Sequence, residues 1–217
     1  MPGLSYIVQP VDVFLAAHWP DNAFYSAPRD ERLQYFEGVQ EFQSANSVID
    51  VLRATYAVRK GGEGIVCSDD RELIKKLYQD GNTCSGALSS GIIPRLDELL
   101  EGIARDIGLT KSCMGTEVFL SQGESGVPMH SDWDINFSLL LRGKKTWKLA
   151  PNRHVVNQTR QIVPAPGMDA GTVVGGIASA GELPFEMPAD CIEFHVSPGG
   201  VVFTPRGWWH QTTSEEE

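Results

Sequence analysis

The chain has 217 residues, of which 41% are hydrophobic and 21% charged, as is typical of a soluble globular protein and not of a disordered one. Its formal net charge is −10, from 28 acidic and 18 basic residues. Direct binding of nucleic acid is not expected, because it requires a basic surface. A basic peptide or protein segment would suit the acidic surface better.

The cysteines indicate a reducing environment. All four, Cys67, Cys84, Cys113 and Cys191, lie far apart without a C-x-x-C pair, so we expect free thiols in a cytoplasmic protein. At the N-terminus no basic segment precedes an apolar run, and no apolar run is long enough for a membrane span. We therefore expect neither a signal peptide nor a membrane partner.

The first half of the chain, residues 1–108, carries the patterns of amphipathic helices. The clearest begins near Pro94 and ends at Gly108, a residue that favours helix termination. Between them Leu96, Leu99, Leu100, Ile103 and Ile107 recur at helical spacing. In chain order, we expect helices over 11–19, 30–42, 47–55, 68–79 and 94–107.

The second half, residues 109–217, is richer in short β-prone segments. We expect strands over 116–121, 136–141, 145–149, 191–196 and 201–204. The Arg142-Gly143-Lys144 segment predicts a tight hairpin between the second and third of these strands. Residues 155–188, rich in Gly, Ala and Pro, predict an irregular loop and a candidate substrate lid. The fold class is therefore mainly β with α: a jelly roll preceded by a helical half, in one domain over 1–217.

A candidate metal site begins at His130 and Asp132. Side chains two residues apart share one face of an extended segment, so the imidazole and the carboxylate can bind the same ion. His210, far downstream, is the best candidate for a third ligand. Two histidines and one carboxylate on one side of a metal leave the opposite positions open, as in non-haem Fe(II) oxygenases.

The segments around these residues resemble a known family. Residues 198–210, PGGVVFTPRGWWH, are similar to the second metal motif of JmjC-type, cupin-fold oxygenases that use Fe(II) and 2-oxoglutarate. Residues 121–147, from Ser-Gln-Gly to Lys-Thr-Trp, resemble their first metal motif, and the FL and HWP elements within residues 14–20 resemble the N-terminus of the cupin-like branch that includes ribosomal-protein hydroxylases.

The resemblance implies a double-stranded β-helix of the cupin/JmjC type that hydroxylates a C–H bond. Iron would be held by His130, Asp132 and His210, with 2-oxoglutarate and O2 in the open positions. Lys145, fifteen residues after the first histidine, would bind the distal carboxylate of 2-oxoglutarate, and Asn136 would lie near this cosubstrate. The substrate class implied is a peptide or protein side chain, or an amino-acid-like small molecule.

Alternatives remain open from the sequence. His195 is a rival third ligand, and Lys145 could be a solvated turn residue. Relatives often carry a tyrosine that bonds the cosubstrate where this chain has Phe119. The chain could therefore be a metal-binding cupin module without catalysis, or a cupin enzyme that does not use 2-oxoglutarate. A homodimer is also left open.

Overall fold

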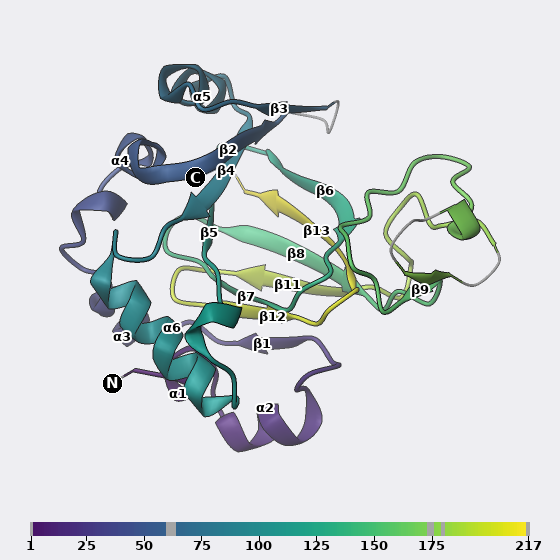
Figure 1. Cartoon of the computed structure of the whole chain (residues 1–217), viewed down its shortest axis with the longest axis horizontal. Coiled ribbons are helices and arrows are strands. Elements are labelled where there is room, and N and C mark those ends of the chain that lie inside the picture. Colours follow the sequence, from purple (N-terminus) through teal and green to yellow (C-terminus); the bar gives the residue numbers. More distant parts are fainter. Residues whose placement is uncertain (1, 60–63, 173–175, 179–180, 216–217) are drawn as a thin grey trace.

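Antiparallel β-sheets with helices along their outer side make up most of the protein (Figure 1). The computed structural model describes residues 2–59, 64–172, 176–178 and 181–215. The α-helices are α1 (Leu4–Ile7), α2 (Val11–Ala17), α3 (Asp30–Tyr35), α4 (Ala45–Val51), α5 (Arg71–Gln79) and α6 (Pro94–Asp106). Three 3-10 turns are η1 (Gln40–Phe42), η2 (Lys111–Cys113) and η3 (Ala170–Thr172).

The strands occur in both halves of the chain. Those of the first half are β1 (Phe24–Ser26), β2 (Leu52–Val58), β3 (Ile65–Cys67) and β4 (Thr83–Leu88). Those of the second half are β5 (Glu117–Leu120), β6 (Gly126–Ser131), β7 (Asn136–Leu139), β8 (Lys145–Ala150), β9 (Val155–Val156), β10 (Ile177–Ala178), β11 (Ile192–Val196), β12 (Val201–Thr204) and β13 (Trp209–Ser214).

Three sheets surround the interior. Their strand orders are β11-β8-β13-β6, β1-β12-β7 and β3-β2-β4-β5, and β9 pairs with β10 in a small separate sheet. The first two sheets pack against each other, since Trp147 and Leu149 of β8 share a buried cluster with Val202 of β12. Sheets packed face to face, with helices outside, confirm the expected mainly β jelly-roll class.

The predicted hairpin between the strands that flank Arg142-Gly143-Lys144 is wrong. β7 pairs with β12, whereas β8 pairs with β11 and β13 in a different sheet. The turn therefore carries the chain from one sheet to the other. A local turn signal identifies the reversal of the chain but not the partner of each strand, which depends on the packing of the two layers.

The first half of the chain is also less helical than predicted. Helices occur in every range expected, but the helix expected over 47–55 ends at Val51, where β2 begins. Four strands lie within the half that was expected to be helical. β4 was missed because its sequence TCSGAL is made of small residues without alternation; it is nearly all buried, as expected for a strand covered on both faces.

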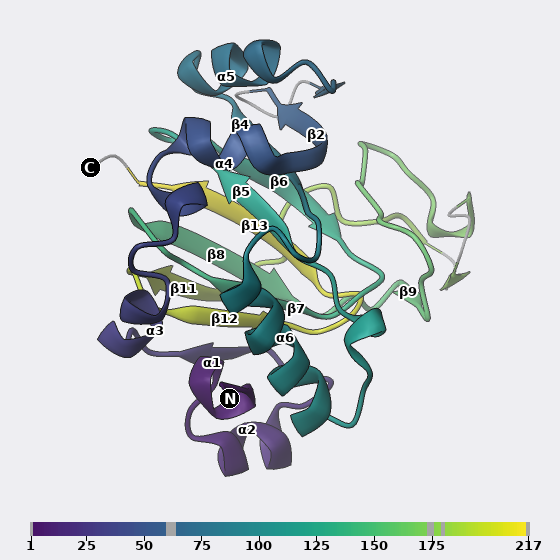
Figure 2. The ribbon, with the colours of Figure 1, turned by 60° about the vertical axis from the view of Figure 1, so that its left-hand side comes forward.

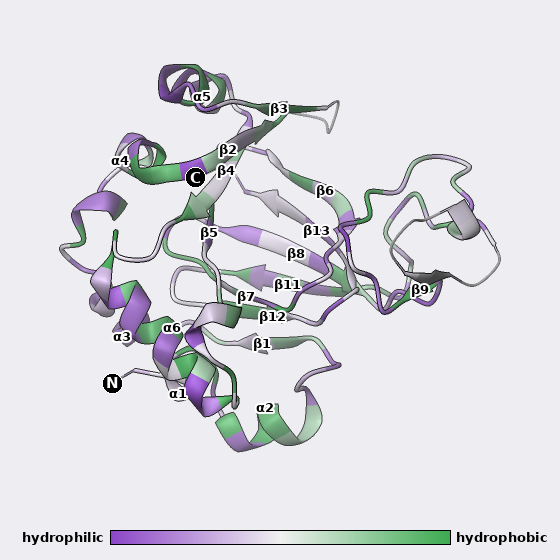
Figure 3. Ribbon diagram, in the orientation of Figure 1, coloured by the Kyte–Doolittle hydropathy of each residue, from purple (hydrophilic) through white to green (hydrophobic). Residues whose placement is uncertain are grey.

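Helices α1, α2 and α6 cover the outer face of the β1-β12-β7 sheet (Figures 1 and 2). Each of the longer helices combines hydrophobic and hydrophilic residues, as the mixed colours of α2 and α6 in Figure 3 show. Phe14 of α2 is fully buried in this layer, with its ring centroid 4.9 Å from that of Phe203 and 5.4 Å from that of Phe24. This layer holds the β1-β12-β7 sheet in place, and β7 begins with Asn136.

The segment predicted as an irregular loop, 155–188, projects from the body of the molecule beside β6 (Figure 1). It contains only β9, η3 and β10 as regular elements among its described residues. Part of the candidate lid, residues 173–175 and 179–180, lies outside the described residues. Among the described helices, none has the length and apolar character needed to cross a membrane.

Replacing Phe14 with alanine should lower the free energy of unfolding by about 3–5 kcal/mol, because it leaves a cavity among aromatic rings that cannot collapse fully. Phe185→Ala is the matched control: Phe185 is 52% exposed, and its loss should change stability by less than about 0.5 kcal/mol. Urea denaturation of both variants measures the difference, and similar losses would contradict the assigned core.

Candidate metal centre

His130 and His210 face each other across two neighbouring strands. They are direct partners in the antiparallel pairing of β6 with β13, so their side chains lie on the same face of the sheet. The ring centroids are 4.1 Å apart, and each residue is 7% exposed. Two residues separated by eighty positions in the chain are thus brought together by strand register alone.

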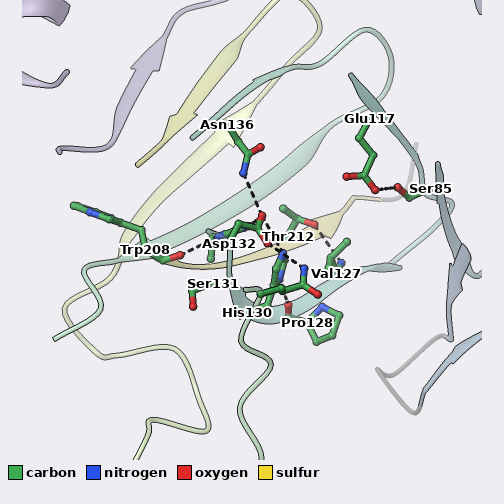
Figure 4. A network of polar contacts seen from close by, with 12 residues as sticks. Ser85, Glu117, Val127, Pro128, His130, Ser131, Asp132, Asn136, Trp208 and Thr212 are labelled. Carbon is green, nitrogen blue, oxygen red and sulfur yellow. Dashed lines mark hydrogen bonds and ion pairs between the residues drawn. The ribbon is translucent and has the colours of Figure 1, made fainter. Parts of the chain in front are cut away.

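Asp132 follows β6 directly and completes the group (Figure 4). Its Oδ2 atom lies 3.4 Å from Nε2 of His210 and 3.8 Å from Nε2 of His130, and one ligand atom from each residue falls within 4.8 Å of the others. Atoms that each lie about 2.1 Å from a common ion are roughly 3–4 Å apart. The spacing of the three donors therefore fits a single metal ion.

Backbone carbonyls orient both imidazoles. Nδ1 of His130 lies 2.8 Å from the carbonyl oxygen of Pro128, and Nδ1 of His210 lies 3.0 Å from that of Trp208. A carbonyl only accepts hydrogen bonds, so each Nδ1 carries the proton and donates it. This tautomer leaves the lone pair of each Nε2 directed at Asp132, as metal-ligating histidines require.

Two amides hold the carboxylate. Asn136 donates to Oδ2 of Asp132 at 3.1 Å, and Gln161 donates to Oδ1 at 3.0 Å. Asn136, singled out from the sequence, thus contacts a candidate ligand directly. Gln161 was missed, because it belongs to the loop after β9, where no local pattern indicates a contact with β6.

The protonation states of His130 and Asp132 favour the binding of a cation. Burial, assisted by the charge of His210, lowers the pKa of His130 to about 4, so this imidazole is neutral at pH 7. Burial opposes the ionisation of Asp132, but the contacts of its carboxylate with His210, His130 and Gln161 outweigh this effect and lower the pKa to about 2. Neutral imidazoles with an ionised carboxylate are the forms that bind metals.

Lys145 lies on the inner side of β8 and is 7% exposed. Its Nζ donates to Oγ of Ser121 at 3.2 Å, and that hydroxyl is 3.0 Å from Oγ1 of Thr83 on β4. Among the described residues no carboxylate pairs with it. Lys145 is therefore a buried cation among hydroxyl groups, not the solvated turn residue that the sequence also allowed.

Burial lowers the pKa of Lys145 from 10.5 to about 8. An anion placed beside Lys145 would offset this cost of burial, because a neighbouring negative charge favours the protonated form of the amine. In the register of β8 with β13, Lys145 of β8 is opposite Ser214 of β13. His210 lies four residues before Ser214 on β13, which is about 13 Å along that strand. The combined length of a lysine side chain and a five-carbon dicarboxylate fits the distance between the level of Lys145 and that of His210. A cavity of about 300 Å³ also borders Lys145 and Ser121, lined further by Phe119.

His195, the rival third ligand, lies outside this group. It is on β11, with a 70% exposed side chain, and Nε2 is 3.2 Å from Oε1 of Glu193. Its Nδ1 is 3.0 Å from Oγ1 of Thr146. In the described part of the chain, the group of three potential metal ligands is His130, Asp132 and His210.

Comparison with known proteins assigns the family. The model of the cupin-like domain matches residues 33–217, so the chain belongs to the family of cupin-like domains, as its motifs predicted. The uncharacterized protein YxbC of Bacillus subtilis (strain 168) is 26% identical over 230 residues, which cover 98% of this chain and 67% of that protein.

Solved structures of YcfD, a ribosomal oxygenase from Escherichia coli, share the fold. The complex with cobalt and succinic acid gives a TM-score of 0.62 at 13% identity, covering 97% of this chain and 49% of that one. The complex with cobalt and 2-oxoglutarate gives 0.53 at 14% identity, covering 97% and 50%. The chain thus spans about half the length of these structures, and the resemblance to the ribosomal-hydroxylase branch is confirmed at the level of the fold.

Alanine at Asp132 or His210 should weaken the binding of Fe(II) by at least about a hundredfold, because each substitution removes one of three ligands. Anaerobic equilibrium dialysis with metal analysis measures the loss. His195→Ala is the control, since that imidazole lies outside the group, and it should bind Fe(II) like the wild type. Loss of iron in His195→Ala with retention in His210→Ala would contradict this assignment.

Lys145→Met removes the buried charge but keeps the length of the side chain. Between about pH 8 and 10.5 the unfolded chain binds more protons at Lys145 than the folded chain, so the stability of the wild type rises with pH in that range. We expect the variant to exceed the wild type by up to about 3 kcal/mol near pH 7, and by much less near pH 10.

Urea denaturation of the metal-free protein at the two pH values measures this difference. Lys148→Met is the control on the same strand, because the Lys148 side chain is 43% exposed and pairs with Glu193. It should show no such dependence. An advantage of Lys145→Met that is equal at both pH values would argue against a buried charge at Lys145.

Proposed function

We propose that the protein is an Fe(II)- and 2-oxoglutarate-dependent dioxygenase that hydroxylates a C–H bond. The observation that carries the proposal is the arrangement of two groups along one inner face of a sheet. The triad of His130, Asp132 and His210 lies at one level, and Lys145 of β8, buried and without a carboxylate partner among the described residues, lies at the level of Ser214, about 13 Å from His210 along β13. The first group suits a divalent metal and the second suits an anion.

The residues of the triad would hold iron on one side only. The Nδ1–carbonyl contacts keep both imidazoles in position, and Asn136 and Gln161 keep the carboxylate turned toward them. Such outer contacts orient ligands and tune their basicity. The open positions would take 2-oxoglutarate and O2, and iron so bound supplies the oxidising chemistry of the reaction.

Lys145 would hold the distal carboxylate of 2-oxoglutarate. A charge-assisted hydrogen bond at a buried site contributes about 1.5–3 kcal/mol, and Ser121 offers a second polar contact to the same group. The YcfD structures support 2-oxoglutarate as the cosubstrate, because one of them holds cobalt with 2-oxoglutarate and another holds cobalt with succinic acid. We infer a peptide or protein side chain as substrate, or an amino-acid-like small molecule. The four free cysteines support a cytoplasmic location.

The test is anaerobic addition of Fe(II), then 2-oxoglutarate, to the metal-free protein while the visible spectrum is recorded. A weak charge-transfer band that needs both additions would show that 2-oxoglutarate chelates the bound iron. Binding of metal without the band would favour a cupin enzyme that uses another chemistry, and absence of metal binding would favour a non-catalytic module.

Titration of the same band tests Lys145. Lys145→Met should raise the dissociation constant for 2-oxoglutarate about ten- to a hundredfold, because the buried cation is lost. Lys148→Met, with its charge at the surface, should leave the constant unchanged. Equal affinity in the two variants would exclude Lys145 from the binding of 2-oxoglutarate.

A further inference from the structure

Gln161 reaches the carboxylate of Asp132 from a short extended segment that pairs with the edge of β6. Ser131 and Ile162 exchange backbone hydrogen bonds of 2.9 Å in both directions, as an antiparallel pair does. The residue before Ile162 is therefore opposite the residue after Ser131, and the two side chains share one face. This register brings Nε2 of Gln161 to 3.0 Å from Oδ1 of Asp132.

The backbone around Gln161 is anchored on both sides. Ile162 is 4% exposed and shares a buried cluster with Trp209, whose side chain points away from the triad because side chains alternate along β13. Gln158 is 1% exposed, and its Oε1 atom accepts a hydrogen bond from Oγ of Ser131 at 3.1 Å. The side chain of Gln161 is itself exposed, so the segment that carries it determines its position.

The two oxygens of Asp132 have different partners. Oδ2 lies 3.4 Å from Nε2 of His210 and 3.8 Å from Nε2 of His130, so this oxygen is directed at the metal position. Asn136 donates to the same oxygen (Figure 4). The other oxygen, Oδ1, accepts the hydrogen bond from Gln161. The two amides therefore act on different oxygens of one candidate ligand.

The number of oxygens that Asp132 provides decides how many positions remain open on a metal ion. A carboxylate binds a metal through one oxygen or through both. With one oxygen, the triad fills three octahedral positions and leaves three, enough for a chelating 2-oxo acid and for O2. With both oxygens, only two positions remain, and the chelating acid would take them. One-oxygen binding by Asp132 is therefore a condition of the proposed reaction.

We propose that Gln161 is a positioning residue whose amide holds Oδ1 and so keeps Asp132 a ligand through Oδ2 alone. This inference rests on the metal centre of the proposed function. A hydrogen bond to a charged oxygen is stronger than one between neutral groups, so turning Oδ1 toward the metal is unfavourable while Gln161 is in place.

The opposite interpretation is that Gln161 only fastens its segment to β6. It predicts a small loss of stability when Gln161 is replaced, with no change in the coordination of the metal. The two interpretations differ in one measurable quantity, the number of water molecules on the bound metal ion.

The experiment uses the full chain loaded with Mn(II), which enhances the relaxation of water protons in proportion to the number of exchanging water molecules bound to it. Electron paramagnetic resonance of free Mn(II) gives the bound fraction and the dissociation constant. We expect about three water molecules on the wild type and about two on Gln161→Met, which keeps the side-chain length without the donor. The dissociation constant should not rise in this variant, because both histidines and the carboxylate remain ligands.

Addition of 2-oxoglutarate extends the measurement. It should displace about two water molecules from either protein, leaving about one on the wild type and none on Gln161→Met. Gln34→Met is the matched control, because it makes the same substitution at an exposed position of α3, and it should keep the counts of the wild type.

Asn136→Ala provides a contrast at the other oxygen. It removes the donor to Oδ2, so the affinity for Mn(II) should fall about tenfold or more, while the ion that still binds keeps about three water molecules. Loss of a contact to Oδ2 should thus change affinity, and loss of the contact to Oδ1 should change the number of open positions.

An unchanged water count in Mn(II)-loaded Gln161→Met would overturn the inference, and so would a count of about two on the wild type. Loss of Mn(II) binding in Gln161→Met would also overturn it, because Asp132 should remain a ligand in that variant. If the wild type binds no Mn(II), the proposed function and this inference both fail. The expected water counts without the charge-transfer band of iron and 2-oxoglutarate would remove the proposed function alone.

Discussion

The site depends on the pairing of His130 with His210 across β6 and β13. Because side chains alternate along a strand, a slip of one residue would turn one imidazole to the opposite face and separate the two. The register shifts just beyond the pair, between His210 and Thr212. There Gly126 passes so close to the backbone of β13 that a Cβ atom would collide with the carbonyl oxygen of Thr212. The absence of a side chain at this position lets the two strands approach.

Charge is distributed unevenly along the interior. At one end the buried Lys145 lies among hydroxyl groups, and at the other the carboxylate of Asp132 lies beside the imidazoles of His130 and His210. Among the described residues Lys145 has no carboxylate partner, and its burial carries a cost that a bound anion would offset. The arrangement suits an anion beside Lys145 and a metal ion at the triad.

The loop after β9 is part of this arrangement. Ser131 and Ile162 exchange backbone hydrogen bonds of 2.9 Å in both directions, so the loop adds a short segment to the edge of β6. Gln161, the residue before, is thereby brought to Asp132. A segment that projects from the body of the molecule is thus fixed at its base to a candidate metal ligand. Movement of the loop would change the hydrogen bond that Gln161 donates to the carboxylate of Asp132.

Local pattern was sufficient for the features that depend on neighbours in the chain. The spacing of His130 and Asp132 predicted a shared face, and the periodicity after Pro94 predicted α6; the positions of His210 and Lys145 followed from motifs. Tertiary structure alone decided which strands pair, and so placed β7 and β8 in different sheets despite the turn between them. It also brought Gln161 to Asp132. These contacts join residues far apart in sequence, and their formation depends on packing and register, which no short segment encodes.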